Sequence, residues 1–374
     1  MIYDCLIVGA GPAGAAAAVR LAQRGWSVAL VDVKAFSVAT RSVGWLSVRA
    51  ASHLAAVGAA LDRLLTTPIR AVTFFSSDFA NSISSEFSEP VGHLVDVARF
   101  DKVLLAAAKA AGVKHVRTPA LDAVDADEDT VRLGLSAGRS LEGRVLLAAD
   151  GSFETLAGPL GLHRSPTAET TWCAQLDIPL RRAAQREKKS RPDSDLRIVL
   201  GLGTGRAFGY VFPHERSTIV GLSWPGNVND LTEAFAEFCT GAAKAGLVPA
   251  GTRLKPDTAV PYATPAGGAL EAESHVAKRT LAIGDAGGFL AAVSNEAIYP
   301  AVWSAELASQ VVHDALTDGH LQDGLARFDT LWRTTMADYL RMPNTDVRFL
   351  WPLVFSNQQM ADKMAAAFLT GQNI

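Results

Sequence analysis

The sequence predicts an α/β fold with a Rossmann-like sheet domain, an antiparallel-sheet domain inserted into it, and a helical C-terminal region. Three observations predict it: a strand–helix–strand pattern around three glycines in residues 1–32, a second glycine-acid turn near residue 285, and short strand-like runs over 170–224. The 374 residues exceed the roughly 250–300 at which a single core stops growing. Two regions that share one ligand are therefore expected.

The N-terminal elements are a strand, a helix and a second strand. Met1–Val8 is an apolar run that ends in a glycine turn, Pro12–Arg24 is rich in alanine, and Ser27–Asp32 is apolar again. A buried strand followed by a crossover helix and another buried strand is the start of a parallel βαβ unit.

The turn between the first strand and the helix has the spacing of a dinucleotide-binding motif. Gly9 permits a tight turn, Gly11 lets the backbone approach a pyrophosphate, and Gly14 lets helix and strand pack closely. The helix N-terminus offers free N–H groups to phosphates. Asp32 ends the second strand, where a carboxylate can accept both ribose hydroxyls. The alternative is an alanine-rich helix after a glycine turn, with no nucleotide.

The remaining elements follow in order along the chain. Residues 38–65 mix loop and helix, and a short meander over 120–151 returns to a buried strand, Val145–Ala149. The charged segment Arg181–Asp195 predicts a long solvated hairpin loop, with partner docking as the alternative. The other expected elements are strands over 71–77, 93–97 and 280–285, helices over 100–111 and 231–246, a long helix that begins near residue 295, and helices with core aromatics over the last fifty residues.

These elements define the expected domain organisation. The Rossmann-like domain is discontinuous, the sheet domain is inserted into it, and the C-terminal region follows both. The expected boundaries are 1–70, 95–165 and 275–315 for the first domain, 71–94 and 166–274 for the substrate-binding sheet, and 316–374 for the helical region.

The second glycine-acid turn, Ile283–Gly288, favours FAD over NAD. An NAD domain would complete its site in the first half of the chain, whereas this turn follows an apolar strand far downstream. Asp285 could bind a polyol, and the helix after Asn295 would direct N–H groups at the same ligand. FAD has the length and the ribitol to use both turns. Its reduced ring also gains from a helix N-terminus, because negative charge develops near N1 and O2.

Several segments resemble those of a known family. They are GAGPAG at 9–14, AADG at 148–151, GDAGGFLAAVSNEAIYPAVWSAELAS at 284–309, GWLSVRA at 44–50, RFD at 99–101 and FGYVFP at 208–213. Together they resemble the FAD-dependent hydroxylases of the p-hydroxybenzoate hydroxylase fold, most closely the geranylgeranyl reductase-like branch, which is related to flavin halogenases. The resemblance covers about residues 2–310 and implies a GR2-type FAD-binding domain.

The resemblance also implies roles for individual residues. Asp32 would bind the adenosine ribose and Asp285 the ribitol, while backbone near Arg41 and Leu121 would contact other parts of the cofactor. The full set of expected cofactor-binding residues is Gly9, Gly11, Pro12, Ala13, Gly14, Asp32, Val33, Lys34, Arg41, Ser42, Arg99, Leu121, Asp150, Gly151, Gly284, Asp285, Asn295, Glu296, Ala297 and Ile298.

The chain departs from the family pattern near the flavin. Ala157 and Val97 stand where the family has arginines, one of them implicated in NADPH handling. A proline and two glycines of the last motif are replaced by Ala292, Asn295 and Ala297. These changes predict a tighter approach to the flavin ring and weaker FAD retention. They also argue against NAD(P)H as a direct electron donor and leave room for a separate reductase.

Aromatic and polar residues on the strands that would cover the flavin form the candidate substrate pocket. Packing in the core is the alternative role for each of them. The candidates are Trp45, His53, Trp172, Gln175, Tyr210, Phe212, Trp224 and Tyr262. No residue is assigned as catalytic, since no Ser-His-Asp, HExxH or P-loop pattern occurs. The halogenase WxWxIP stretch is replaced by YVFP, which disfavours halogenation.

Composition limits the partners. A net charge of -3 gives no general attraction to nucleic acid. The three cysteines lack the spacing of a disulfide framework or a metal site and favour a reducing compartment. No run of roughly 18 apolar residues predicts a membrane span, so a cytoplasmic location is expected.

Three functions remain open from the sequence. The first is a monooxygenase that hydroxylates an electron-rich, aromatic substrate, free or within a peptide, through a flavin C4a-hydroperoxide. The second is a flavin-dependent reductase of isoprenoid double bonds, as the most similar branch implies. The third is a flavin-binding partner protein without enzymatic activity.

Overall fold

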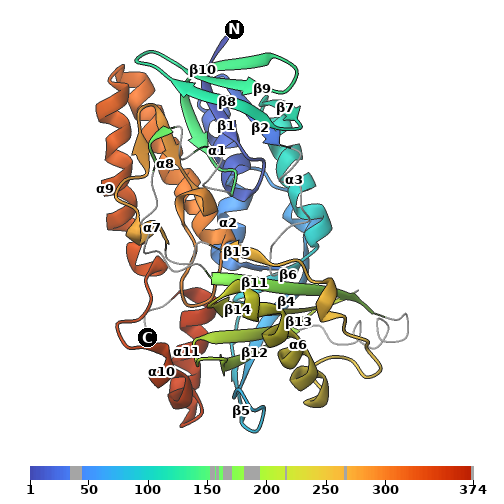
Figure 1. Cartoon of the computed structure of the whole chain (residues 1–374). Coiled ribbons are helices and arrows are strands. Elements are labelled where there is room, and N and C mark those ends of the chain that lie inside the picture. The colour runs from blue at the N-terminus through green and yellow to red at the C-terminus, as the bar shows by residue number, and fades with distance from the viewer. Residues whose placement is uncertain are drawn as a thin grey trace.

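Two sheets organise the molecule, an eight-stranded sheet beside the N-terminus and a nine-stranded sheet at the opposite end (Figure 1). The structure is a computed structural model that describes residues 1–33, 44–151, 156, 160–162, 171–180, 194–214, 217–264 and 268–371. The expected positions Lys34, Arg41, Ser42 and Ala157, and most of the charged segment 181–195, lie outside the described residues.

The first sheet is built on parallel strands. Its order is β16-β17-β10-β1-β2-β7, and β1 (Ile2–Val8) pairs in parallel with β2 (Val28–Val33) and β10 (Arg139–Ala148). Apolar side chains alternate between two clusters, one on each face of the sheet, as expected of a parallel sheet covered on both sides. The other strands are β7 (Lys114–Thr118), β8 (Leu121–Ala126), β9 (Val131–Leu135), β16 (Val276–Ala277) and β17 (Thr280–Ala282).

Helices α1 (Pro12–Gln23), α3 (Val97–Ala110), α8 (Ile298–Asp318) and α9 (Leu321–Leu340) cover one face of this sheet (Figure 1). Polar contacts hold α8 against the first crossover helix: Arg20 pairs with Glu306 at 2.5 Å, and the Trp26 indole donates to His313 Nδ1 at 3.0 Å. The predicted βαβ unit is confirmed. The long helix begins at Ile298, so Pro300 falls in its first turn, where a missing N–H is tolerated.

The second sheet has the order β15-β11-β14-β13-β12-β4-β6-β3, with β5 paired to β4. All its pairs are antiparallel except β12 with β4. Its strands are β3 (Trp45–Ser47), β4 (Leu65–Phe75), β5 (Ser82–Glu86), β6 (Gly92–Val95), β11 (Thr171–Pro179), β12 (Ser194–Leu202), β13 (Ala207–Pro213), β14 (Ser217–Pro225) and β15 (Tyr262–Thr264).

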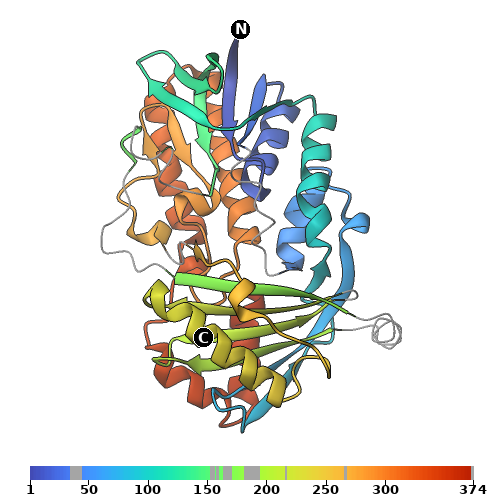
Figure 2. The same cartoon turned by 45° about the vertical axis from the view of Figure 1, so that its right-hand side comes forward.

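Helices cover this sheet on both faces (Figure 2). Helix α6 (Val228–Lys244) packs on one face through Phe235 and Phe238, and α10 (Val347–Val354) and α11 (Gln358–Thr370) pack on the other. Shorter elements complete the chain: η2 (Leu61–Arg63), α2 (Val48–Ala56), η3 (Pro256–Thr258), α7 (Gly268–Glu271) and η4 (Gly284–Gly287).

Some segments lie in a different sheet from the one that their expected domain implies. Strand β3 and the first residues of β4, placed with the first domain, pair in the second sheet. The helical C-terminal region is divided, because α9 packs on α8 whereas α10 and α11 pack on the second sheet. The domain boundaries stay a proposal, in which we now assign these segments to the domain of the second sheet.

Gly209 gives a test of how α6 packs on the second sheet. A Cβ at this position would overlap the Phe238 ring, so Gly209→Ala forces the ring or the strand to move. We expect the free energy of unfolding to fall by about 1–3 kcal/mol in urea titrations. Thr232→Ala on the exposed side of the same helix is the control, with an expected change within about 0.5 kcal/mol. Equal stability of the two variants would contradict the described packing.

Candidate functional site

Three turns meet at the carboxyl edge of the first sheet. Strands β1, β10 and β17 run parallel, and Val8, Ala148 and Ala282 lie at their ends in neighbouring register. Backbone hydrogen bonds continue the pairing past the strands, from Ala149 N to Val8 O and from Ile283 N to Ala148 O, both 2.8–2.9 Å. The residues that follow each strand are therefore neighbours in space.

Glycines make this close approach possible. Gly9 has φ +106°, and a Cβ there would clash with the Ala149 carbonyl. A Cβ at Gly14 would clash with the Gly9 carbonyl, and one at Gly284 would lie 2.7 Å from Ala13 Cβ. The Gly9–Gly14 turn thus touches the turn that carries Asp285, which is the arrangement that a shared ligand requires.

The start of α1 is open toward this edge. Gly11 is its N-cap and no side chain caps the helix, Pro12 follows, and the first turn has no acidic residue. A side chain at Gly11 would meet no described atom within 4 Å. The N–H groups of a first helical turn have no partner within the helix, and they attract anions. This cradle of glycines fits the pyrophosphate of a dinucleotide.

Asp32 lies at the end of β2 among basic groups from β7. Its carboxylate is 3.4 Å from Arg117 Nε and 3.6 Å from His115 Nε2. Burial lowers the pKa of His115, and the charge of Asp32 opposes this shift. Burial also raises the pKa of Asp101, and Asp32 adds to the rise. A ribose bound at Asp32 would therefore have a histidine and an arginine beside it.

The residues before α8 differ from the family pattern and show how the chain accommodates the change. Asn295 has φ +54°, a left-handed conformation in which glycine is usual and asparagine is tolerated. Its side-chain amide donates to the Ser223 hydroxyl on β14. The start of α8 is thereby tied to the second sheet.

Glu296 is a buried carboxyl group at the same place, with 4% of its surface exposed. The Tyr339 hydroxyl of α9 donates to it. Burial raises the pKa of Glu296 to about 7, although hydrogen bonds from Tyr339 and Ser47 and the charge of Arg49 oppose the rise. The carboxyl group consequently changes its charge near neutral pH.

One face of the second sheet carries the polar pocket candidates. The Tyr210 hydroxyl donates to Gln175 Oε1 at 3.0 Å, and the Phe212 ring stacks on Tyr210 with centroids 5.0 Å apart. Burial raises the pKa of Tyr262 well above its ordinary value, and the nearby Tyr210 and Cys173 add to the rise. A Cβ at Gly221 would overlap the Tyr210 ring, so this glycine makes room for the phenol.

Two of the aromatic candidates lie on the opposite face. Trp172 and Trp224 pack in the cluster around α6, because side chains alternate along β11 and β14. We therefore leave them out of the proposed pocket. Trp45 is buried in the cluster with α10 and α11. His53 lies on α2 and contacts Glu306 of α8 at 2.7 Å.

The other expected cofactor residues occupy varied positions. Arg99 is 58% exposed on its side chain and pairs with Asp96 at 3.1 Å. Asp150 is buried, Gly151 has φ +71°, and Leu121 begins β8. Val33 is buried at the end of β2, and Ala297 and Ile298 form the N-cap and first residue of α8.

Sequence reasoning missed several polar residues of this region. Ser223 lies opposite both Cys173 and Phe208 in the sheet register, so Cys173 and Ser223 share the face of Gln175 and Tyr210. Period-two alternation along each strand was the signal that could have placed them there. No local signal pairs Tyr339 with Glu296.

Comparison with known proteins agrees with this geometry. A parallel sheet with a glycine turn at the carboxyl ends of its strands is the architecture of a dinucleotide-binding domain. The family match and the similar proteins make this chain a flavin-dependent oxidoreductase. The family described as FAD binding domain matches residues 3–217, more than half of the chain. The chain belongs to this family and binds FAD. The predicted α/β fold, the family resemblance and FAD as the cofactor are confirmed.

One curated relative is the digeranylgeranylglycerophospholipid reductase of Methanosphaerula palustris, 27% identical over 365 residues, which cover 89% of this chain and 82% of the relative. A geranylgeranyl bacteriochlorophyll reductase-like structure from Thermoplasma acidophilum has a TM-score of 0.74 at 17% identity, covering 98% of this chain and 96% of the other.

A third similar structure is 2-methyl-3-hydroxypyridine-5-carboxylic acid oxygenase, with a TM-score of 0.64 at 18% identity, covering 98% of this chain and 96% of the other. Among the described residues, no helix has the length and apolar character needed to cross a membrane.

The buried Glu296 predicts a pH dependence of stability. Because the pKa of about 7 in the folded protein lies above the ordinary value of 4.5, the contribution of Glu296 to stability is present below the unfolded pKa and is lost as pH rises through about 7. Glu296→Gln removes this ionisation. We expect the free energy of unfolding of the variant, relative to wild type, to rise by about 1–3 kcal/mol between pH 5 and pH 8.

Urea unfolding at both pH values, with FAD at one saturating concentration, measures this difference. Glu237→Gln on the exposed side of α6 is the matched control, and its difference from wild type should not change with pH. A Glu296→Gln difference that stays constant from pH 5 to pH 8 would show that the carboxyl group does not titrate in this range.

Proposed function

We propose that this FAD-dependent oxidoreductase hydroxylates an electron-rich aromatic substrate, free or within a peptide, between the start of α8 and the second sheet. One observation supports this proposal most directly: polar side chains lie together on one face of the second sheet. They are Tyr210, Gln175, Cys173 and Ser223. Such groups recognise a polar aromatic molecule through hydrogen bonds and ring contacts. A hydrocarbon chain offers no hydrogen bond to this face.

Each side chain has a definite part in this proposal. Burial raises the pKa of Tyr210, which therefore stays a neutral phenol and donates to Gln175. Phe212 and Tyr210 give an aromatic wall that excludes water from the reacting centre. Asn295 and Ser223 bound the end of the pocket next to the cofactor. FAD, when bound, supplies the electrons and the reaction with oxygen.

The electron donor in this proposal is a separate reductase. Val97 and Ala157 stand where the family has two arginines, one of which is implicated in NADPH handling. The three cysteines are buried and form no disulfide, in keeping with our proposal of a cytoplasmic location. Rapid oxidation of NADPH by the purified protein alone would contradict the proposed donor.

A second candidate function is the reduction of isoprenoid double bonds. The name of the 27% identical relative favours it, and that relative matches 89% of this chain. The same cofactor site would serve both reactions, so the substrate-facing residues decide between them. An isoprenoid chain on this face would contact the Phe208 and Phe212 rings, and it would also meet the hydroxyl groups of Tyr210, between them, and of Ser223, opposite Phe208.

Single-turnover oxidation of the photoreduced protein separates the two functions. We expect a panel of phenols and indoles to yield hydroxylated product only when oxygen is present, and a geranylgeranyl lipid to leave the flavin reduced without oxygen. Flavin oxidation by the lipid under anaerobic conditions would support the reductase instead.

Tyr210→Phe tests the proposed pocket in the same assay. Loss of the hydroxyl should raise KM for the best aromatic substrate about tenfold, because one buried hydrogen bond is lost. Photoreduction of the flavin should be unchanged. Tyr3→Phe on β1 is the matched control, with no expected change in KM. An unchanged KM in Tyr210→Phe would remove this residue from the pocket.

A further inference from the structure

A buried histidine outside the proposed pocket connects α9 to the turn that carries Asp285. His275 precedes β16 and is 1% exposed. Its Nδ1 lies 3.2 Å from Asp329 Oδ1, and its Nε2 lies 2.7 Å from the Gly287 carbonyl oxygen. A carboxylate and a carbonyl both accept hydrogen bonds, so the imidazole bridges two acceptors, one from α9 and one from the turn.

Hydrogen bonds hold Asp329 as an anion. It accepts hydrogen bonds from the Ser274 hydroxyl at 2.6 Å, from His275 N at 3.0 Å and from the Trp332 indole at 3.2 Å. Burial alone would raise the pKa of Asp329, but the hydrogen bonds from His275 and Ser274 outweigh it and lower this pKa to about 2. Asp329 is therefore ionised throughout the neutral range.

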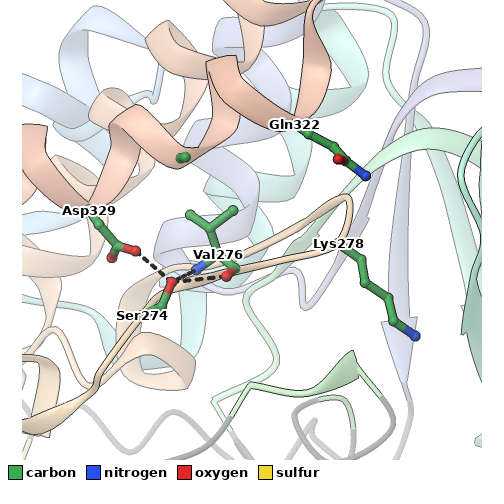
Figure 3. A pocket seen from close by; sticks show the side chains of 6 residues that line it. Ser274, Val276, Lys278, Gln322 and Asp329 are labelled. Atoms are coloured by element: carbon green, nitrogen blue, oxygen red, sulfur yellow. Dashed lines mark hydrogen bonds between the residues drawn. The ribbon is translucent and has the colours of Figure 1, made fainter.

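Few other charges face this pair. Asp329 lines an open cavity of about 410 Å³ with Ser274 and Lys278, and the Lys278 side chain points away from the carboxylate (Figure 3). On α9, the Arg333 guanidinium lies 4.5 Å from the Trp332 ring centroid. Otherwise aromatic rings enclose the imidazole, with the centroids of Phe289 and Trp332 at 4.8 and 4.9 Å and that of Phe328 at 6.3 Å.

The Gly287 carbonyl needs this donor. It ends η4, a single turn of four residues, and the last carbonyls of a helix have no partner within it. The turn is packed tightly on its other sides, since a Cβ at Gly287 would lie 2.6 Å from the Phe289 ring, and one at Gly288 would lie 2.5 Å from Ala269 N. The histidine therefore contacts the Gly287 carbonyl and holds the end of the turn.

We propose that His275 is a positioning residue for FAD, which through the Gly287 carbonyl holds the Gly284–Gly288 turn so that Asp285 faces the ribityl chain. This inference rests on the proposed role of that turn in binding FAD. Helix α9, through Asp329, thereby becomes part of the cofactor site although it does not touch the cofactor.

His275→Phe tests the inference, because it keeps an aromatic ring in the cage and removes both ring nitrogens. We expect the Kd for FAD, measured by flavin fluorescence, to rise about tenfold or more, the usual effect of losing a charge-assisted hydrogen bond. The Kd for ADP should not change, because ADP needs only the Gly9–Gly14 turn and Asp32. A general loss of folding would weaken both ligands equally.

Asp329→Asn is the second variant, since it leaves the ring in place and removes the charge of the carboxylate that the ring contacts. We expect about a threefold or larger loss of FAD affinity with ADP affinity unchanged. Wild-type FAD affinity in either folded variant would overturn the inference.

Asp285→Asn distinguishes failure of this inference from failure of the proposed FAD site. If Asp285→Asn weakens FAD binding and His275→Phe does not, the positioning role fails while the site stands. If neither Asp285→Asn nor Gly14→Val affects FAD binding, the proposed site itself is wrong.

Discussion

The fold depends on the close contact between the first glycine turn and the turn after β17. Parallel pairing places the ends of β1, β10 and β17 side by side, and Gly284 packs directly on Ala13. A side chain at Gly284 would push these two turns apart, one at Gly9 would meet the Ala149 carbonyl after β10, and one at Gly14 would meet the Gly9 carbonyl. Two chain segments about 270 residues apart thus form one edge, and Asp32 lies at the same edge three strand spacings, about 14 Å, from β17.

The second sheet is attached to this edge through the start of α8. Asn295 reaches the Ser223 hydroxyl, and Glu296 is held by Tyr339 from the following helix. Asn295, where the family has a glycine, therefore adds a polar link between the start of α8 and the second sheet. The same residues bound the proposed pocket, so in our proposal cofactor binding and substrate binding share one structural element.

Much of the first sheet and its turns could be predicted, because the sequence signals for them are local. Apolar runs, the Gly9–Gly14 spacing and the second glycine-acid turn each lie within a short stretch, and the parallel register follows from the βαβ unit. The pocket was harder to predict. Alternation along β11 separates Trp172 from Gln175, but only the position of α6 decides which face is covered, and that contact is not local.

Polar pairs between distant segments of the chain were beyond sequence reasoning. His275 and Asp329 are 54 residues apart, and Glu296 and Tyr339 are 43 apart, on elements whose packing depends on the whole core. The basic neighbours of Asp32 come from β7, which is distant along the chain and pairs with β2 in the sheet. In each case the partner is set by tertiary packing, and no spacing along the chain encodes it.

A crystal structure of the protein with bound FAD tests the central claim most directly. The account predicts one FAD molecule extended along the carboxyl edge, with its pyrophosphate at the start of α1, its adenosine ribose at Asp32 and its ribityl chain at Asp285. An FAD molecule that contacts only one of these two carboxylates, or that lies away from the edge, would contradict it.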